Sequence, residues 1–438
     1  MQKESNKPNL LFISHGFPPN SIGGTEQHVH SLAEALHDRY EVFVLCRDAK
    51  GPEPERDNPY ILRLPPASNF GSVDELVALH EPEFEKAVIQ QLEDLRPEMV
   101  HLHHWFHLSN SLVQLIAARG IPVVVTLHDH YPICARTNML RRGIEICPGP
   151  EGGWACADCL PPPGAAFIKE SPLQRMLRRL RSRVFNLRGL PTYLRKSSAE
   201  IFRARLDNLH NELCQASFII CPSAALKREM VAVWPDLETH LTVLAHGLAT
   251  SWGVKVNRTK AEKIRFAYIG NLMPHKGIDT LLEAFRILDR PQAMLTLYGA
   301  CPDVQYAQKI ESKAKAYGVM LRGKYRQADL PGIYSEIDVA IVPSLCKESA
   351  SLSTTEAFIG GAPVIASNLG ALPEAVKDGE NGLLFQVGDA NDLAQKMRSF
   401  LDSPMTVQRF RQKLQQPKTI EYYAGEISAI YGQVMRKK

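Results

Sequence analysis

Several features that would restrict the function are missing from this chain of 438 residues. No stretch approaches the about 18 consecutive apolar residues of a spanning helix, so we expect no transmembrane segment. The first residues, MQKESNKPN, lack the apolar run of a signal peptide, so we expect no export signal. The glycines near the amino terminus do not form a G-x-G-x-x-G fingerprint, which argues against a dinucleotide ligand.

The bulk composition predicts a soluble protein with more than one domain. The length exceeds what one hydrophobic core usually supports, so two domains or more are expected. A hydrophobic fraction of 45% with 22% charged residues is typical of globular proteins. The nine cysteines are an odd number in a chain without an export signal, which indicates reduced thiols and a cytoplasmic location.

Positive charge is concentrated in residues 171–205, although the formal net charge of the chain is only +4. One acid, Glu200, stands against ten basic residues: Arg175, Arg178, Arg179, Arg181, Arg183, Arg188, Arg195, Lys196, Arg203 and Arg205. Apolar residues follow the spacing of one helix face: Leu173, Met176, Leu177, Leu180 and Val184. Such a helix favours an anionic membrane, which predicts peripheral contact with its inner face. The alternative is a solvated surface insertion. No nucleic-acid-binding motif accompanies the patch, so no nucleic acid is expected.

Apolar, β-branched runs alternate with helical patterns along the whole chain. In the first half these runs are 10–14, 41–46, 99–103, 122–127, 217–223 and 241–247. After a polar stretch the rhythm restarts with 264–270, 293–299, 319–323, 338–344 and 363–367. Continuous hydrophobicity is typical of strands buried on both faces of a parallel sheet. The sequence therefore predicts an α/β protein with two doubly wound, Rossmann-like domains joined near residue 250.

The stretch from Val342 to Phe385 is the most informative. It places Glu348 and Glu356 eight positions apart across a loop-to-helix junction, followed by an apolar strand and the turn NLGALPE. A carboxylate beside a helix N-terminus can hold a sugar hydroxyl, and the free N–H groups of the helix can meet a phosphate. The constellation resembles the glutamate-x7-glutamate signature of retaining glycosyltransferases of family 4, which have the GT-B fold.

This resemblance implies two Rossmann-like domains that face an interdomain cleft. Residues 1–249 would be the acceptor-side domain, with an insertion at about 134–212. Residues 250–415 would bind the nucleotide-sugar, and the helix of 416–438 would cross back to pack on the first domain. In the family the second glutamate contacts the nucleotide ribose and the first contacts the transferred sugar. The resemblance therefore gives Glu356 the ribose, and Glu348, on the transferred sugar, a catalytic role. A capping box formed by Ser353 and Glu356 is the competing, purely structural explanation of Glu356.

The same resemblance assigns further donor-binding residues. GNLMPHKGID follows a predicted strand and places Lys276 where the family has a lysine on the donor diphosphate. Asn271 stands where many members carry arginine. The backbone N–H groups of Ser351, Leu352 and Ser353 would point at the diphosphate, although this loop has Ala350 and Ser351 where many members have phenylalanine and glycine.

In the first domain, GFPPNSIGGTEQHVHSLAEAL resembles the amino-terminal motif of the family. Gly23 and Gly24 would let the backbone approach the donor closely just before a helix. The resemblance gives His128, after a predicted strand, a catalytic place near the transferred sugar, with His130 as the alternative. His101–His104 are interpreted as structural or as lining the cleft.

The resemblance implies transfer from a UDP- or GDP-sugar to a glycan or lipid-linked acceptor, with retention at the front face. No Asp-x-Asp motif is present to hold Mg²⁺, so Lys276 and helix N-termini would neutralise the diphosphate without a metal or any other cofactor. Two alternatives stay open: a sugar-nucleotide epimerase or hydrolase of the same fold, and a catalytically degenerate binding subunit.

Four cysteines form a separate group: Cys134, Cys147, Cys156 and Cys159. The CADC pair has a spacing found in zinc sites, and four thiolates can form a closed structural tetrahedron. The sequence thus predicts one structural zinc, with unconnected thiols as the alternative.

Overall fold

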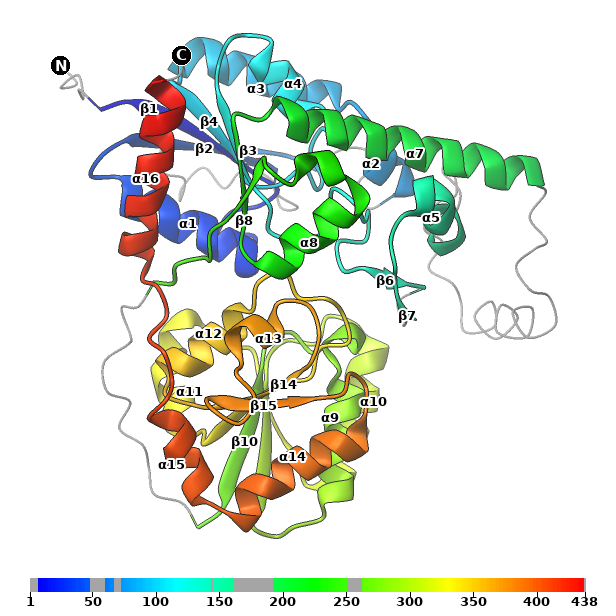
Figure 1. The fold of residues 1–438 in the computed structure, drawn as a ribbon, viewed down its shortest axis with the longest axis vertical. Coiled ribbons are helices and arrows are strands. Elements are labelled where there is room, and N and C mark those ends of the chain that lie inside the picture. Colours follow the sequence, from blue (N-terminus) through cyan, green and yellow to red (C-terminus); the bar gives the residue numbers. More distant parts are fainter. Residues whose placement is uncertain are drawn as a thin grey trace. The chain divides into compact units, whose positions relative to one another are not determined.

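The structure is a computed structural model that describes residues 7–47, 60–66, 72–142, 145–160, 192–249 and 262–436. The chain forms two compact units (Figure 1). The N-terminal unit comprises Met1–Cys221, Glu229–Thr242 and Ser428–Lys438. The C-terminal unit comprises Pro222–Arg228 and Val243–Ile427. Helices α8 (Ala224–Val233) and α16 (Ile420–Arg436) therefore each contribute residues to both units.

The N-terminal unit is built on a seven-stranded sheet in the order β3-β2-β1-β4-β5-β8-β9. Its strands are β1 (Asn9–Ser14), β2 (Glu41–Arg47), β3 (Ile61–Leu64), β4 (Met99–Leu102), β5 (Val123–Thr126), β8 (Phe218–Cys221) and β9 (Leu241–Val243). The central strand β1 pairs in parallel with β2 and β4, so that Leu10 lies opposite Val42 and Met99. All four residues of β4 and of β5 are buried, as expected for strands covered on both faces.

Helices cover this sheet and carry the connections between its strands: α1 (Gly24–Leu36), α2 (Val73–Val77), α3 (Pro82–Leu95), α4 (Leu112–Ala117), α5 (Trp154–Cys159) and α7 (Thr192–Gln215). Helix α3 shows why the sequence is helical there. Glu81 accepts the N–H of Phe84 at 2.6 Å as the N-cap, and Pro82 opens the first turn. Phe84, Val88 and Leu92 follow at four-residue spacing and form the buried face. A short hairpin, β6 (Leu140–Arg141) with β7 (Glu145–Ile146), and the 3₁₀ turns η1 (Glu151–Gly153) and η2 (Pro235–Leu237) complete the unit.

Helix α7 is fixed to the unit by two buried charged side chains. Glu212 accepts the backbone N–H groups of Val113 at 2.7 Å and Gln114 at 2.8 Å, so it caps the otherwise unsatisfied first turn of α4. Arg205 is 2% exposed and donates to the carbonyl oxygens of Leu76 and Tyr131. Arg205 therefore does not belong to a membrane-facing basic surface, which corrects the sequence prediction at this position. Residues 171–191 of that predicted surface lie outside the described residues.

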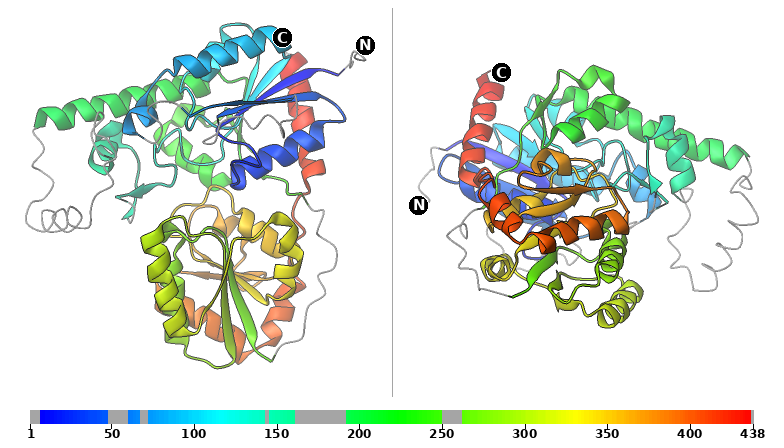
Figure 2. Two further views of the ribbon diagram at one scale, coloured as in Figure 1. Left: turned by 180° about the vertical axis from the view of Figure 1, so that it is seen from behind. Right: turned by 60° about the horizontal axis from the view of Figure 1, so that its bottom comes forward.

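The C-terminal unit contains a six-stranded parallel sheet in the order β12-β11-β10-β13-β14-β15 (Figure 2). Its strands are β10 (Ile264–Ile269), β11 (Ala293–Tyr298), β12 (Met320–Gly323), β13 (Val339–Val342), β14 (Val364–Ser367) and β15 (Gly382–Phe385). The connections contain α9 (Ile278–Leu288), α10 (Val304–Tyr317), α11 (Leu330–Ser335), α12 (Leu352–Ile359), α13 (Leu372–Ala375), α14 (Ala390–Asp402) and α15 (Met405–Arg411), with 3₁₀ turns η3 (Pro274–Lys276) and η4 (Gln327–Asp329).

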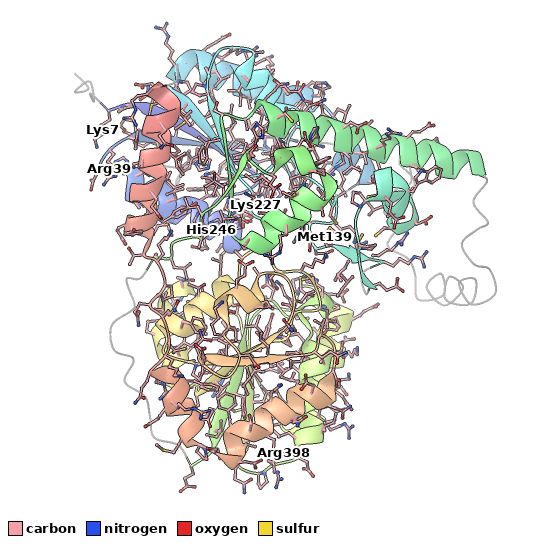
Figure 3. All side chains as sticks on the ribbon, in the orientation of Figure 1. Lys7, Arg39, Met139, Lys227, His246 and Arg398 are labelled. Atoms are coloured by element: carbon pink, nitrogen blue, oxygen red, sulfur yellow. The ribbon has the colours of Figure 1, made fainter. Side chains whose placement is uncertain are left out.

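Successive residues of the C-terminal strands pack into two different cores, one on each face of the sheet. In β10, Phe266 and Tyr268 join the core formed with α9, α10 and α14. Ala267 and Ile269 join the core formed with α11, α12 and α13. Side chains accordingly fill both sides of this sheet (Figure 3). The alternation follows from the two-residue period of a strand and explains why the four consecutive residues Phe266–Ile269 are all hydrophobic.

Helix α16 ends in the N-terminal unit. Its residue Tyr431 is fully buried, and its hydroxyl lies 2.6 Å from His101 Nδ1, beside the ring of Tyr40. His101 Nε2 lies 2.8 Å from Thr126 Oγ1 on β5. Burial lowers the pKa of His101 to about 3, so this histidine is neutral and links α16 to the sheet.

Candidate functional site

The order of strands places a candidate site at one edge of the C-terminal sheet. β10 and β13 are neighbours, but β11 lies on the other side of β10, so the chain changes direction between them. In open α/β sheets, ligands bind beyond the carboxyl ends of the strands at such a point. The loop after β10 carries Lys276, and the loop after β13 carries Glu348. The two residues that the sequence singled out separately are therefore brought together by topology.

Lys276 and Glu348 form an ion pair, with 2.8 Å between Lys276 Nζ and Glu348 Oε1. Ser344 donates a second hydrogen bond of 2.5 Å to the same oxygen. Burial alone would raise the pKa of Glu348, but the charge and hydrogen bond of Lys276 hold it below its ordinary value. Burial would lower the pKa of Lys276, and Glu348 raises it instead. Both groups are charged at neutral pH, and the lysine side chain keeps 31% of its surface exposed.

A glycine makes the close approach of the two loops possible. Gly277, directly after Lys276, has φ +75°, and a Cβ there would lie 1.8 Å from the carbonyl oxygen of Pro343. Next to this contact, the N–H of Leu345 donates to the carbonyl of His275 at 2.9 Å. Only glycine fits both the left-handed backbone and the missing space. The position of Lys276 against Glu348 thus depends on a residue that carries no chemistry itself.

The backbone of the turn NLGALPE packs against the backbone of Glu348. Gly370 has φ +59°, and a Cβ there would meet the backbone N and O of Glu348, each at 2.7 Å. The N–H of Ala371 donates to the carbonyl of Glu348 at 2.9 Å. The sequence pointed to this turn only by resemblance, and the structure shows that its backbone holds the Glu348 loop.

The start of α12 differs from the predicted capping box. The helix begins at Leu352, and Ser351 is the N-cap, whose side chain accepts the N–H of Thr354 at 3.3 Å. Ser353 is therefore the second residue of the helix, and Glu356 is the fifth. The capping-box interpretation of Ser353 and Glu356 is wrong, because the serine two positions earlier takes the N-cap place. A purely structural explanation of Glu356 is thereby removed.

Glu356 lies half-buried on α12 with little to stabilise its charge. Gln327 Nε2 is 3.5 Å from Glu356 Oε1, a long contact. Burial raises the pKa of Glu356 to about 7. A half-buried carboxyl with a displaced pKa and a weak protein partner is well suited to a ligand that donates hydrogen bonds.

The other predicted donor residues lie around the same strand ends. Asn271 is exposed after β10, and its carbonyl accepts from the Tyr268 hydroxyl at 2.8 Å. Leu352 and Ser353 form the first turn of α12, whose N–H groups have no acceptor within the helix. Ser351 uses its hydroxyl for the cap. These positions can present N–H groups to an anion.

The N-terminal sheet has a corresponding change of direction between β1 and β4. Helix α1 follows β1, and it begins at Gly24 with Gly23 as its N-cap. A Cβ at Gly23 would lie 2.5 Å from Glu26 Oε2. Glu26 in the first turn of α1 accepts from Ser21 Oγ at 2.7 Å and pairs with His15 Nε2 at 3.3 Å. Burial would raise the pKa of Glu26, but His15 and Ser21 lower it to about 2, so the carboxylate is ionised.

A second histidine–carboxylate pair lies beside the first, and the rings of His15 and His104 are 4.6 Å apart. The N–H of Phe106 donates to His104 Nδ1 at 2.7 Å, so His104 Nε2 carries the proton and donates to Asp129 Oδ2 at 3.1 Å. Burial lowers the pKa of His104. Burial alone would raise the pKa of Asp129, but the neighbouring His104 lowers the pKa of Asp129 below its ordinary value. Asp129 keeps 29% of its side chain exposed.

Sequence reasoning missed His15, Glu26 and Asp129 and treated His104 only as part of a histidine run. A signal was available, since His15, His104 and Asp129 each stand just beyond the end of a predicted strand. Parallel strands bring such positions to the same edge of the sheet.

The predicted catalytic histidine also lies in the N-terminal unit. His128 follows β5 and is 8% exposed, with its Nε2 3.1 Å from His103 Nδ1 and its ring 5.4 Å from that of His28. His130, the alternative, is 1% exposed, and its carbonyl accepts the N–H groups of Ile133 and Cys134 in a turn. His128 is the more accessible of the two.

The four cysteines of the predicted zinc site are all free thiols. Cys134, Cys147, Cys156 and Cys159 belong to the described residues, yet no three of their sulfur atoms lie within 4.8 Å of one another. Burial, together with the neighbouring thiols, raises the pKa of Cys156 to about 12. A closed tetrahedron would require these side chains to move together, and the zinc stays a prediction.

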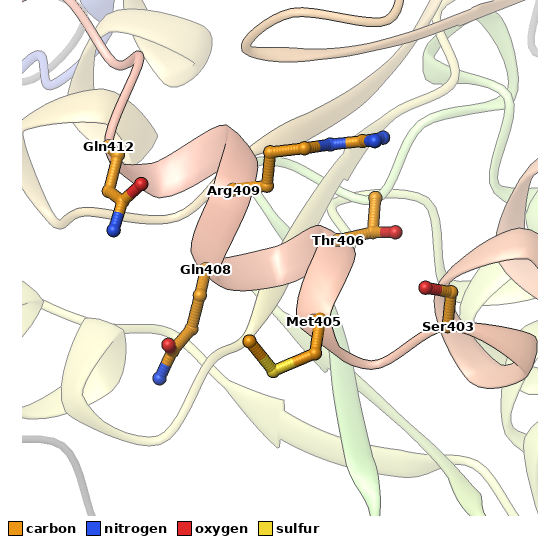
Figure 4. Close-up of a pocket in the computed structure, with 6 residues that line it drawn as sticks. All are labelled: Ser403, Met405, Thr406, Gln408, Arg409 and Gln412. Carbon is orange, nitrogen blue, oxygen red and sulfur yellow. The ribbon is translucent and has the colours of Figure 1, made fainter.

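A shallow hollow of about 280 Å³ lies on α15, lined by Ser403, Met405, Thr406, Gln408, Arg409 and Gln412 (Figure 4). It contains none of the predicted donor or catalytic residues. Among the described residues, no helix has both the length and the apolar character needed to cross a membrane.

These two doubly wound units, each with a polar cluster at its strand-order reversal, define the class of GT-B glycosyltransferases. Residues 22–252 match the family described as Glycosyltransferase Family 4, and residues 254–416 match Glycosyl transferases group 1. The chain belongs to glycosyltransferase family 4. The predictions of family, fold and transferase activity are thereby confirmed.

Individual relatives agree with this assignment. The glycogen synthase of Mycobacterium tuberculosis (strain CDC 1551 / Oshkosh) is 25% identical, over 97% of this chain and 94% of its own. Among solved structures, sucrose-phosphate synthase from Thermosynechococcus elongatus superposes with a TM-score of 0.70 at 20% identity, covering 99% of this chain and all of its own. Anabaena Alr3699/HepE in complex with UDP and glucose has a TM-score of 0.63 at 16% identity, covering 97% of this chain and 99% of its own.

Proposed function

We propose that this glycosyltransferase is a metal-independent, retaining enzyme that moves a sugar from a nucleoside-diphosphate sugar to a glycan or lipid-linked acceptor. The observation that carries the proposal is the Lys276–Glu348 ion pair at the strand-order reversal of the C-terminal unit. It joins a cation suited to a diphosphate and a carboxylate suited to sugar hydroxyls. The structure of Anabaena Alr3699/HepE with UDP and glucose supports a donor of this kind.

Each donor-site group has a role that follows from its chemistry. Lys276 attracts the diphosphate, aided by the N–H groups that open α12, and Glu348 accepts hydrogen bonds from the sugar. Glu356 accepts from the ribose hydroxyls, which favour its ionised form. The sequence has no Asp-x-Asp pair, so we assign neutralisation of the leaving diphosphate to Lys276 and the helix N-terminus.

In the transfer itself, the bond between the anomeric carbon and the diphosphate oxygen breaks. The new bond to the acceptor oxygen forms on the same face, and the acceptor proton passes to the leaving diphosphate. Glu348, ionised and paired with Lys276, holds no proton to donate, which distinguishes this scheme from the acid–nucleophile pair of glycosidases. We assign the acceptor to the N-terminal unit, where His128 and the partly exposed Asp129 offer hydrogen bonds to hydroxyl groups.

The test is a panel of UDP-, GDP- and ADP-sugars incubated with glycan and lipid-linked acceptors, with and without a metal chelator. We expect nucleoside diphosphate to be released faster with one acceptor, unaffected by the chelator, and NMR to show the anomeric configuration of the donor in the product. Release at the same rate without any acceptor would instead support the epimerase or hydrolase alternative. If the protein binds no nucleotide, the catalytically degenerate binding subunit is the alternative that remains.

A further inference from the structure

A second cluster of ligand-type side chains lies in the N-terminal unit, apart from every residue assigned above. His210 and Cys214 stand four residues apart in the last two turns of α7, which places them on one face of the helix. Asp236 reaches them from the turn η2. Among the described residues, this is the one group of three histidine, cysteine or acidic ligand atoms that all lie within 4.8 Å of one another.

The geometry of the three groups is convergent. Asp236 Oδ2 lies 2.8 Å from His210 Nε2, and Cys214 Sγ lies 3.6 Å from the same nitrogen and 4.0 Å from Nδ1. In a proton relay, the carboxylate and the thiol would occupy opposite nitrogens of the ring. Here Cys214 Sγ lies over the ring, at similar distances from both nitrogens, so the three groups do not form a relay. All three ligand atoms lie within 4.8 Å of one another, so a rotation of the Cys214 side chain would bring its sulfur to a centre in front of Nε2 and Oδ2.

The distances fit a particular kind of centre. With about 2.05 Å to nitrogen and about 2.3 Å to sulfur, a tetrahedral zinc site separates these two ligand atoms by about 3.6 Å. The observed Nε2–Sγ separation has this value, and the sulfur must move from above the ring to a position in front of Nε2 while keeping it. The Nε2–Oδ2 separation is that of a hydrogen bond and would lengthen by about 0.5 Å around a metal. A set of one nitrogen, one thiolate and one carboxylate suits zinc and its neighbours in the first transition series.

We propose that His210, Cys214 and Asp236 bind one divalent transition metal of the zinc class, with water in the fourth position. Cys214 and Asp236 are exposed, so the fourth position opens to solvent.

The scaffold fixes the backbone segments that carry the ligands. The residues next to Cys214, Glu212 and Leu213, are fully buried, and Glu212 is fixed by the cap on α4. On the other side, Leu237 is fully buried beside Asp236, and the ring of buried Trp234 lies 5.4 Å from that of His210. A bound metal would tie the end of α7 to η2, with little loss of backbone freedom on binding.

The experiment titrates metal-free protein with Co²⁺, whose thiolate charge-transfer absorption reports a sulfur ligand. We expect wild type to take up one more equivalent with this absorption than Cys214→Ser or His210→Gln, and Asp236→Asn to bind that equivalent more weakly. Cys301→Ser, a partly exposed thiol of the C-terminal unit, is the matched control and should behave like wild type. Any metal on Cys134, Cys147, Cys156 and Cys159 would contribute equally to all of these proteins.

Only variants with the wild-type melting temperature in the absence of metal enter the comparison. Zn²⁺ should then raise the melting temperature of wild type and of Cys301→Ser, and leave Cys214→Ser unchanged. Equal Co²⁺ uptake and equal charge-transfer absorption in wild type, Cys214→Ser and His210→Gln would overturn the proposal. The cluster would then be a histidine–aspartate hydrogen bond beside an ordinary thiol.

Discussion

Replacing Glu356 with glutamine tests whether this half-buried carboxylate binds the ribose, because the effects on stability and on nucleotide affinity are expected to have opposite signs. Burial raises the pKa of Glu356 from 4.5 to about 7 in the folded chain. Between these two pH values the folded protein keeps a proton that the unfolded protein has released. The stability contributed by this group therefore falls as the pH rises from 4.5 to 7 and stays low above that.

The size of this effect follows from the shift. One pKa unit corresponds to about 1.4 kcal/mol, so the shift limits the effect to about 3.5 kcal/mol. The side chain is half-buried and its charge is partly solvated, so we expect about 1–2 kcal/mol. Glutamine does not titrate. Glu356→Gln should therefore be more stable than wild type by this amount at about pH 8 and nearly equal to it near pH 4.5.

Nucleotide affinity should change in the opposite direction. Hydrogen bonds from ribose hydroxyls to a carboxylate contribute about 1.5–3 kcal/mol, so the substitution should weaken nucleotide binding by about tenfold to a hundredfold. Calorimetric titration measures the affinity, and thermal unfolding across pH 4.5–8 measures the stability. Because two units need not unfold together, the relevant transition is the one that added nucleotide shifts.

Glu380→Gln is the control, since Glu380 is an exposed carboxylate of the same unit and its substitution should change neither property. If Glu356→Gln matches wild type in stability above pH 7 and in nucleotide affinity, the reasoning about this residue is refuted. A gain in stability with full affinity would confirm the buried charge and remove the ribose role.

Three further predictions address other parts of the molecule. Gly277→Ala should cost at least about 2 kcal/mol of stability and most of the nucleotide affinity, whereas Gly318→Ala, also at positive φ but with no atom within 4 Å of its added Cβ, should cost only about 1 kcal/mol and no affinity. Elemental analysis should find one more equivalent of zinc in wild type than after replacement of Cys156 and Cys159, and a zinc content unchanged by these replacements would rule the site out. Binding to phosphatidylglycerol vesicles should weaken when salt is added and when glutamate replaces Arg175, Arg178, Arg179 and Arg181. Vesicle binding that neither salt nor these substitutions change would indicate a solvated insertion.

The fold could be predicted because its signal is local and repeated. The centres of runs 264–270 and 338–344, Phe266–Ile269 and Val339–Val342, are hydrophobic at every position, which follows from burial on both faces of a sheet. Lys276 and Glu348 could be selected from the sequence, but their contact could not. The contact depends on β10 and β13 being neighbours in the sheet. It also depends on Gly277, because a Cβ at this position would lie 1.8 Å from the carbonyl oxygen of Pro343, so no other residue fits.

Helix ends and contacts between residues far apart in the chain could not be predicted from the sequence. Ser351 and Ser353 are both serines that precede an apolar helical pattern, and the backbone geometry decides between them. Arg205 had the appearance of an exposed basic residue, but it lies against carbonyl oxygens that are more than 70 residues away in the chain. The pairing of His104 with Asp129 likewise joins two loops that only the sheet brings together.

The central claim is that the C-terminal unit binds a nucleoside diphosphate through Lys276, and one measurement tests it directly. Calorimetry on wild type and Lys276→Ala should compare each nucleoside diphosphate (UDP, GDP and ADP) with its nucleoside, and Lys324→Ala provides an exposed-lysine control. We predict that Lys276→Ala lowers the affinity for the nucleoside diphosphate that binds by about tenfold to a hundredfold and leaves the affinity for its nucleoside nearly unchanged. Lys324→Ala should change neither affinity. Equal losses for diphosphate and nucleoside, or no loss at all, would contradict the account.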